Sequence, residues 1–271
     1  MTTGAFRTDD GCLLAYEDSG QGMPVLWQHG LGADRNQPAE VFPAIAGIRR
    51  LTLECRGHGN SELGDPARLS IATFEADARA LLDHLEITQA IVGGISLGAA
   101  ISMRLAALHP AGVAGLILAR PAWVEGPSNT MAPYLEIAEL MKKIGATEGA
   151  LRFEVSACLA AVAAVSPDNA ASLKSFFTRP NPESTIALLS SIPKDSPRVD
   201  GDRIAKIAVP TLIIANDHDY VHPLAYANRL KQILPNATLQ VITAKSINKD
   251  LYRFDFNETL RRFLTGMAVA Q

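Results

Sequence analysis

Residues 94–98 read Gly-Ile-Ser-Leu-Gly, and the middle residue, Ser96, is the strongest candidate nucleophile in the chain. A short apolar run precedes this segment, and a mostly apolar stretch with helical periodicity follows it. A Gly-x-Ser-x-Gly segment between a strand and a helix is typical of a nucleophile elbow, a sharp turn that exposes the serine hydroxyl. We therefore expect a strained Ser96 at a helix N-terminus, flanked by glycines because a Cβ would collide with neighbouring elements.

A second segment, His29-Gly30-Leu31-Gly32, directly follows the first long apolar run. A loop at this place can bring the backbone N–H of Leu31 close to that of Leu97. Two such donors form an oxyanion hole, which stabilises the negative charge of an acyl-transfer intermediate. His29 itself is predicted to shape the turn, with no role as an acid or base.

Residues 54–61, Glu-Cys-Arg-Gly-His-Gly-Asn-Ser, follow another apolar run and predict a structural turn. We interpret Arg56 and His58 as hydrogen-bond donors that brace this loop, because a lone histidine is most often a satisfied structural group.

A candidate acid lies in residues 216–223, Asn-Asp-His-Asp-Tyr-Val-His-Pro, after a late apolar run. An acid at the carboxyl end of a late strand can orient a catalytic histidine in the chain order serine then aspartate. Asp219 is preferred for this role, and Asp217 is interpreted as a solvated loop residue.

Short apolar runs and amphipathic stretches alternate along the chain and predict an α/β fold with a doubly wound, mostly parallel sheet. Ser70 is predicted to cap a helix expected at 71–85. Strands are predicted at 25–27, 51–53, 90–92, 113–118, 211–214 and 239–242, and helices at 71–85, 97–108 and 250–264.

Residues 122–203 break this alternation and contain no predicted strand. Helices are predicted at 132–144, 148–164, 169–177 and 184–191, so the segment is interpreted as a helical insertion between two strands. Its aromatic and aliphatic side chains predict a largely apolar pocket above Ser96. Arg120 and Trp123, beside a strand end, are the predicted substrate contacts, and Arg120 could equally bind a carboxylate or pin the insertion.

These four motifs, in this order and over nearly the whole chain, resemble the α/β-hydrolase superfamily. The likeness is greatest to its small bacterial esterases, lactonases and carbon–carbon hydrolases. The resemblance implies a core of residues 1–121 and 204–271 with a helical cap at 122–203. It also implies Ser96 as nucleophile, Asp219 as acid, Leu31 and Leu97 with Gly30 as the oxyanion site, and no cofactor or metal. The expected substrate is a small to medium, mostly apolar ester, lactone or related carbonyl compound.

The sequence departs from this family in one respect that decides its chemistry. The family's base is a histidine after the last strand, but no histidine follows His222, and that position falls near Lys245 and Ser246. Loss of a triad histidine removes on the order of a millionfold in rate, which corresponds to about 8 kcal/mol.

Four hypotheses address the missing base. His222 or His218 takes the role, and His222 is the residue assigned here. In the second, Lys245 or Lys249 acts as the base, which requires a site without water that strongly lowers the pKa of the lysine. In the third, Tyr252 or Asp250 takes part in a different, non-hydrolytic reaction without a cofactor, in which Ser96 only hydrogen-bonds the substrate. In the fourth, the fold is a small-molecule binding module with impaired catalysis.

The overall composition limits the remaining classes. The chain has 271 residues, a net charge of −3 and 48% hydrophobic residues, so it has no basic surplus for binding nucleic acid. Its three cysteines are far apart, which argues against a disulfide framework. With no predicted secretion signal or membrane span, the chain is expected to be cytoplasmic and to act on a small molecule. The oligomeric state stays open, a homo-oligomer included.

Overall fold

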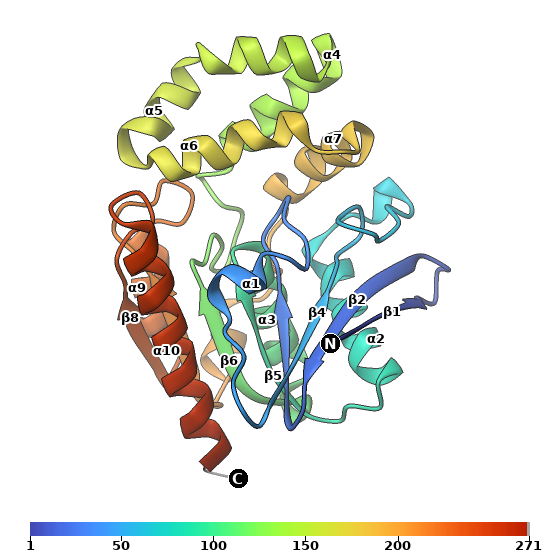
Figure 1. Ribbon diagram of the computed structural model, residues 1–271, viewed down its shortest axis with the longest axis vertical. Coiled ribbons are helices and arrows are strands. Elements are labelled where there is room, and N and C mark those ends of the chain that lie inside the picture. The colour runs from blue at the N-terminus through green and yellow to red at the C-terminus, as the bar shows by residue number, and fades with distance from the viewer. Residues whose placement is uncertain (270–271) are drawn as a thin grey trace.

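An eight-stranded sheet forms the centre of the computed structural model, which describes residues 1–269, with the strand order β1-β2-β4-β3-β5-β6-β7-β8 (Figure 1). Strands β4, β3, β5, β6, β7 and β8 run parallel, whereas β2 is antiparallel to both β1 and β4. The strands are β1 Thr2–Arg7, β2 Leu13–Gly20, β3 Met23–Gln28, β4 Ile48–Leu53, β5 Ala90–Ile95, β6 Val113–Ala119, β7 Thr211–Ala215 and β8 Ala237–Val241.

The six predicted strands and the mostly parallel α/β sheet are confirmed, and β1 and β2 are additional. The sequence did not indicate them because β1 is mostly exposed and carries few apolar residues. Strand β2 ends in a polar stretch, Glu17 to Gly20. Neither segment is the continuous apolar run that marks a strand buried on both faces.

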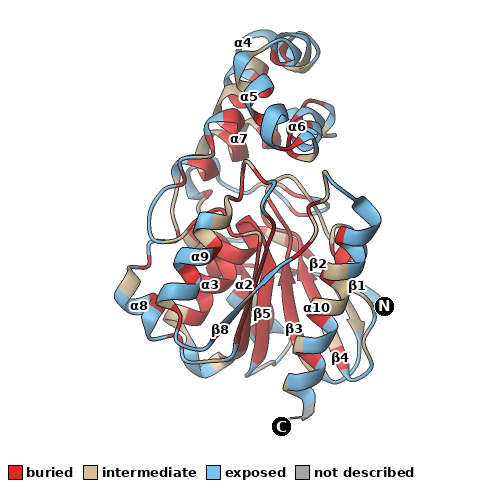
Figure 2. Cartoon of the chain, turned by 90° about the vertical axis from the view of Figure 1, so that its left-hand side faces the viewer, coloured by how far each residue is buried: buried red, intermediate tan, exposed pale blue. Residues whose placement is uncertain are grey.

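Helices cover both faces of the sheet, and each face has its own buried cluster (Figure 2). One face packs against α2 (Ile71–His84), α3 (Leu97–Leu108), α8 (Gly201–Ala205) and α9 (Leu224–Ile233). The other packs against α1 (Pro38–Val41) and α10 (Lys249–Val269). Ser70 caps α2 as predicted, because its Oγ accepts a hydrogen bond from the Thr73 N–H at 3.0 Å.

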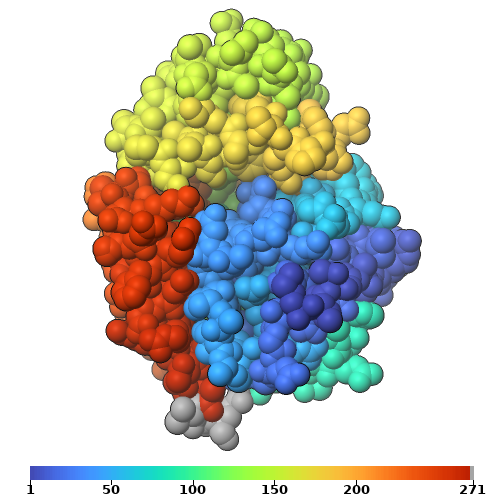
Figure 3. All heavy atoms as spheres, viewed as in Figure 1, coloured from blue at the N-terminus to red at the C-terminus, as the bar shows by residue number. Residues whose placement is uncertain are grey.

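The cap contains four α-helices. It lies over one end of the sheet (Figure 1), and the space-filling view shows it covering that end of the molecule (Figure 3). The helices predicted at 132–144 and 148–164 have other bounds. One helix spans Ala132–Glu154 with a kink at Gly145, and Ser156 caps the next by accepting from the Leu159 N–H at 3.0 Å. The division of the chain at residues 122 and 203 stays a prediction. The cap helices are α4 Ala132–Glu154, α5 Ala157–Val165, α6 Pro167–Lys174 and α7 Pro182–Ser191.

The loops that carry the sequence motifs follow the parallel strands β3, β4, β5 and β7. Carboxyl ends of parallel strands share one edge of a sheet, and binding sites of open α/β sheets lie at that edge. The fold therefore gathers segments from residues 29 to 223 into one place. Within residues 1–269, no helix combines the length and hydropathy needed to cross a bilayer.

Candidate active site

Ser96 occupies the sharp turn between β5 and α3, with φ 58° and ψ −108°. This left-handed conformation is strained for a residue with a side chain, and its backbone N–H is held by the Ala119 carbonyl at 2.9 Å. A Cβ at Gly94 would lie 2.4 Å from the Gln28 carbonyl oxygen, and one at Gly98 would lie 2.3 Å from it. Both glycines are needed because strand β3 passes directly against the turn.

Replacing Gly98 by alanine is therefore expected to lower the free energy of unfolding by about 1–3 kcal/mol, because backbone atoms must move. Urea denaturation of the purified variant measures this loss. Gly266→Ala in α10 is the matched control, since a Cβ there meets no atom of the described residues within 4 Å. Equal stability of the two variants would contradict the crowded turn.

A cavity of about 270 Å³ lies between Ser96 and the cap. Nine of its fourteen lining residues have polar or charged side chains, so the expectation of a largely apolar pocket is wrong. The apolar cap residues pack on one another instead, as in the contact between the Tyr134 and Phe176 rings. The lining consists of Gly30, Leu31, Gln37, Ile95, Ser96, Arg120, Tyr134, Asp168, Asn169, Ala171, Ser172, Val221, His222 and Lys245.

The loop after β3 is held by His29, whose ring is fully buried. Its Nε2 accepts a hydrogen bond from the Cys55 N–H at 3.0 Å, so Nδ1 carries the proton and donates to the Gly30 carbonyl at 2.8 Å. Burial lowers the pKa of His29 to about 4. The ring is neutral at pH 7 and both of its nitrogens have structural partners, in agreement with the predicted role.

His58 holds the same loop from the opposite side. Its Nε2 accepts from the Gly32 N–H at 3.0 Å and its Nδ1 donates to the Arg56 carbonyl at 2.9 Å. Arg56 is buried in ion pairs with Asp77 and Asp10. The interpretation of Arg56 and His58 as bracing residues agrees with these contacts.

Of the two predicted oxyanion donors, Leu31 lines the cavity, whereas Leu97 is buried and does not line it. Neither the Leu31 N–H nor the Leu97 N–H donates a backbone hydrogen bond within residues 1–269. Leu31 and Gly30 line the cavity, and Gln37 fixes their loop by accepting from the Gly30 N–H at 2.8 Å. Leu97 is the first residue of α3, where the helix dipole favours a developing negative charge.

Asp219 and His222 lie in one turn of the loop after β7. The Oδ1 atom of Asp219 accepts from His222 Nδ1 at 2.8 Å and from the His222 backbone N–H at 3.1 Å. The other nitrogen of His222, Nε2, is buried and has no hydrogen-bond partner among residues 1–269. His222 and Ser96 line the same cavity but are not hydrogen-bonded to each other.

Arg120 completes this group by donating from Nε to Oδ2 of Asp219 at 2.6 Å. Burial alone would raise the pKa of Asp219, but the charge of Arg120 and the contact with His222 hold it well below its usual range. For His222, burial lowers the pKa, Asp219 opposes this shift, and Arg120 adds to it. The imidazole is therefore neutral at pH 7, the form in which Nε2 can accept a proton.

Replacing Arg120 by methionine is expected to raise the pKa of His222, because the cation that disfavours imidazolium is removed. If neutral His222 is required for turnover, the acid limb of kcat/KM then moves to higher pH. Steady-state rates between pH 4.5 and 8 measure this shift, and Arg120→Lys should restore part of it. An unmoved limb in Arg120→Met would contradict the coupling.

The cap holds the loop of Asp219 and His222 in place through Val221. The Val221 N–H donates to Asn169 Oδ1 at 3.0 Å, and Thr130 Oγ1 donates to the Val221 carbonyl at 2.8 Å. Sequence reasoning missed Asn169 and Thr130, since nothing in their local sequence marks a contact 52 or 91 residues away.

The other candidate bases, His218 and Lys245, are paired with carboxylates. His218 forms an exposed pair with Asp217 at 2.7 Å and does not line the cavity. Lys245 lines the cavity, but its Nζ lies 3.3 Å from Glu40 and 3.7 Å from Asp168. These carboxylates make it part of a salt-bridge network between the core and the cap.

The remaining candidates lie outside the cavity. Trp123 is buried, and its Nε1 donates to the Asp195 carbonyl at 3.1 Å, so its position does not support the predicted substrate contact. Tyr252, on α10, is buried against Phe256 in the cluster between this helix and the sheet. Lys249 and Asp250, at the start of α10, are exposed and do not line the cavity.

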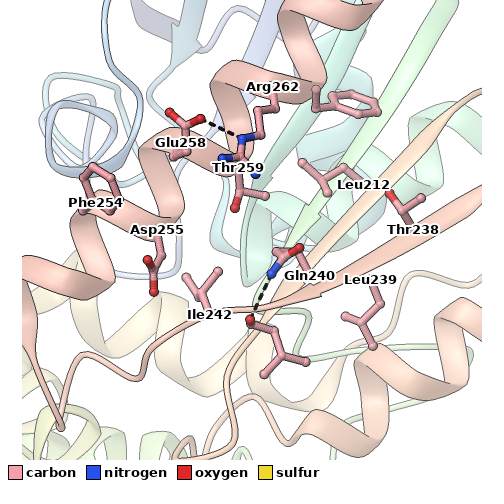
Figure 4. Close-up of a pocket in the computed structure, with 12 residues that line it drawn as sticks. Leu212, Thr238, Leu239, Gln240, Ile242, Phe254, Asp255, Glu258, Thr259 and Arg262 are labelled. Atoms are coloured by element: carbon pink, nitrogen blue, oxygen red, sulfur yellow. Dashed lines mark hydrogen bonds and ion pairs between the residues drawn. The ribbon is translucent and has the colours of Figure 1, made fainter.

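A larger groove of about 500 Å³ lies between β8 and α10 (Figure 4). Among the side chains that line it, Glu258 is bonded to Arg262. It shares no residue with the cavity at Ser96 and contains no serine, cysteine or histidine. The groove therefore offers no comparable set of reactive groups.

The sheet order, the strained serine turn and the overlying helices define the α/β-hydrolase class of proteins. Residues 23–245 match the model of the alpha/beta hydrolase fold family, and the chain belongs to that family. The resemblance drawn from the four motifs is confirmed.

Individual relatives are similar over different lengths. The chain is 39% identical over 115 residues to the dihydrolipoyllysine-residue acetyltransferase component of the acetoin cleaving system of Pseudomonas putida. That match covers 40% of this chain and only 30% of the relative. It is 27% identical to the non-heme chloroperoxidase CPO-A1 of Kitasatospora aureofaciens, over 95% of this chain and 98% of that protein.

Among solved structures, the chain is similar to Est816, described as an N-acyl homoserine lactone degrading enzyme. The TM-score is 0.72 with 26% identity, over 96% of this chain and 100% of that chain.

Proposed function

We propose that this protein hydrolyses small carboxylic esters or lactones, with Ser96 as nucleophile and His222 as its general base. The observation that carries the proposal is the buried, unpartnered Nε2 of His222 in the cavity of Ser96, with Nδ1 already bonded to Asp219. A base oriented in this way by a carboxylate is what an activated serine requires.

In the proposed mechanism, Ser96 Oγ attacks the substrate carbonyl carbon and its proton passes to His222 Nε2. The Leu31 and Leu97 N–H groups stabilise the resulting oxyanion. His222 then protonates the leaving alcohol, or the ring oxygen of a lactone, and an acyl-enzyme remains on Ser96. A water molecule, deprotonated by His222, attacks this ester and releases the acid and the free serine.

Asp219 fixes the tautomer of His222 in this scheme and stabilises the imidazolium that forms. The missing hydrogen bond between Nε2 and Ser96 Oγ fits an empty site, since catalytic hydrogen bonds often tighten only when substrate binds. The base and the acid then come from one loop, and no histidine after β8 is needed.

The polar cavity favours a small substrate with hydrogen-bonding groups beside the reacting carbonyl. This differs from the mostly apolar substrate expected from the sequence. Est816 degrades N-acyl homoserine lactones, which combine a lactone with an amide, and its likeness to this chain supports testing lactones as well as open esters.

Stopped-flow hydrolysis of 4-nitrophenyl acetate tests the proposal. We expect a burst of 4-nitrophenolate equal to the enzyme concentration or faster turnover without a burst, and both signals should disappear in Ser96→Ala. If the wild-type protein shows no turnover dependent on Ser96 but still binds small polar molecules, the binding-module hypothesis would replace this one.

A further inference from the structure

The cap places one tyrosine hydroxyl in the cavity of Ser96. Tyr134, near the start of α4, is 8% exposed and lines that cavity. Its ring packs edge-on against Phe176, with centroids 5.5 Å apart and an interplanar angle of 83°. This contact fixes the ring, so the direction of the hydroxyl is set by the cap.

The Tyr134 hydroxyl has no hydrogen-bond partner in the part of the chain that the structure describes. Burial raises the pKa of Tyr134, so the group remains a neutral donor across the physiological pH range. A hydroxyl donor that no protein group uses can donate to an acceptor atom of a ligand in the cavity. Tyr134 is therefore ready to bind an acceptor atom.

The charged groups of the cavity are already paired with one another. Arg120 is bonded to Asp219 at 2.6 Å, and Lys245 lies between Asp168 and Glu40. These pairs already offset much of the charge that a substrate carboxylate or ammonium group would meet. The Tyr134 hydroxyl, in contrast, is an uncharged donor that no ion pair occupies.

We propose that the Tyr134 hydroxyl donates a hydrogen bond to an uncharged oxygen in the acyl or alcohol part of the substrate. Tyr134 is then a specificity-determining residue that selects oxygen-bearing esters and lactones over alkyl esters of the same size. This inference rests on the proposed ester hydrolysis by Ser96 and adds the substrate class to it.

Two pairs of isosteric esters test the inference, because each pair differs only by one CH₂ replaced by oxygen. The acyl pair is 4-nitrophenyl butyrate and 4-nitrophenyl methoxyacetate, and the alcohol pair is butyl acetate and 2-methoxyethyl acetate. The measured quantity is the ratio of kcat/KM for the ether ester to that for the alkyl ester. Intrinsic reactivity cancels when this ratio is compared between wild type and Tyr134→Phe.

We expect Tyr134→Phe to lower this ratio about five- to tenfold in at least one pair, the effect of one lost hydrogen bond. Tyr16→Phe, in the β1–β2 hairpin outside the cavity, is the matched control and should leave both ratios unchanged. A purely structural role of Tyr134 would reduce both esters of a pair equally, and unchanged ratios in both pairs would overturn the inference.

The assay also separates this inference from the proposed function. If wild-type turnover depends on Ser96 and the ratios do not change, the inference fails and the proposed hydrolysis stands. If wild type shows no turnover that depends on Ser96, the proposed function fails and this inference fails with it.

Discussion

Ser96→Ala is expected to lower kcat for ester hydrolysis on the order of a millionfold, the effect of removing the nucleophile of a serine triad. The backbone N–H of residue 96 keeps its hydrogen bond to Ala119, and the flanking glycines still fit the turn. The oxyanion donors remain, so a residual rate of roughly a thousandfold over water is expected. Steady-state kinetics with 4-nitrophenyl acetate measure the loss.

The stability of this variant serves as the control for its activity. Urea denaturation should give a midpoint close to that of the wild type, because the hydroxyl is the only group removed. A Ser96→Ala protein that folds and retains more than a tenth of the wild-type kcat would contradict the nucleophile assignment.

His222→Ala is expected to cause a loss of similar size, because a serine hydroxyl without a base is a poor nucleophile at neutral pH. The double variant Ser96→Ala/His222→Ala should be no slower than either single variant, since residues that act as a unit show non-additive effects. Asp219 keeps the ion pair with Arg120 in these variants, which limits the cost in stability.

His218→Ala is the matched control, because His218 belongs to the same loop but is exposed and outside the cavity. Its kcat should stay within about twofold of the wild-type value, as for most surface substitutions. If His222→Ala lost less than tenfold, the base would lie elsewhere, and Lys245 would be the next residue to replace.

The core of the fold could be predicted because local sequence determines it directly. Strands β5, β6 and β7 are buried along almost their whole length, and such strands appear as short apolar runs. The serine turn could also be predicted, because its Gly-x-Ser-x-Gly pattern is local. Glycine is required at positions 94 and 98 because a Cβ at either position would lie within 3 Å of strand β3.

The polarity of the cavity could not be predicted, because it depends on which face each cap helix turns toward Ser96. Asp168, Asn169 and Ser172 share one face of α6, and that face lines the cavity. The large apolar residues of the cap pack together on the other side. The number of apolar residues in the cap therefore does not indicate how polar the cavity lining is.

The base presents an intermediate case. The three-residue separation of Asp219 and His222 permits their contact, but the sequence cannot show that Nδ1 turns toward the carboxylate and leaves Nε2 in the cavity. The positions of Asn169 and Thr130, which hold Val221, are set by tertiary contacts alone.

The central claim is that Ser96 is activated by His222, and the rate at which a fluorophosphonate labels Ser96 tests it most directly. Each label forms one bond from Ser96 Oγ to phosphorus and expels fluoride, so no later hydrolytic step enters the measurement. We expect rapid labelling, located at Ser96 by peptide mass spectrometry, in wild type and His218→Ala, and a loss of at least a thousandfold in His222→Ala. Labelling of His222→Ala at the wild-type rate, or modification at another residue, would contradict the claim.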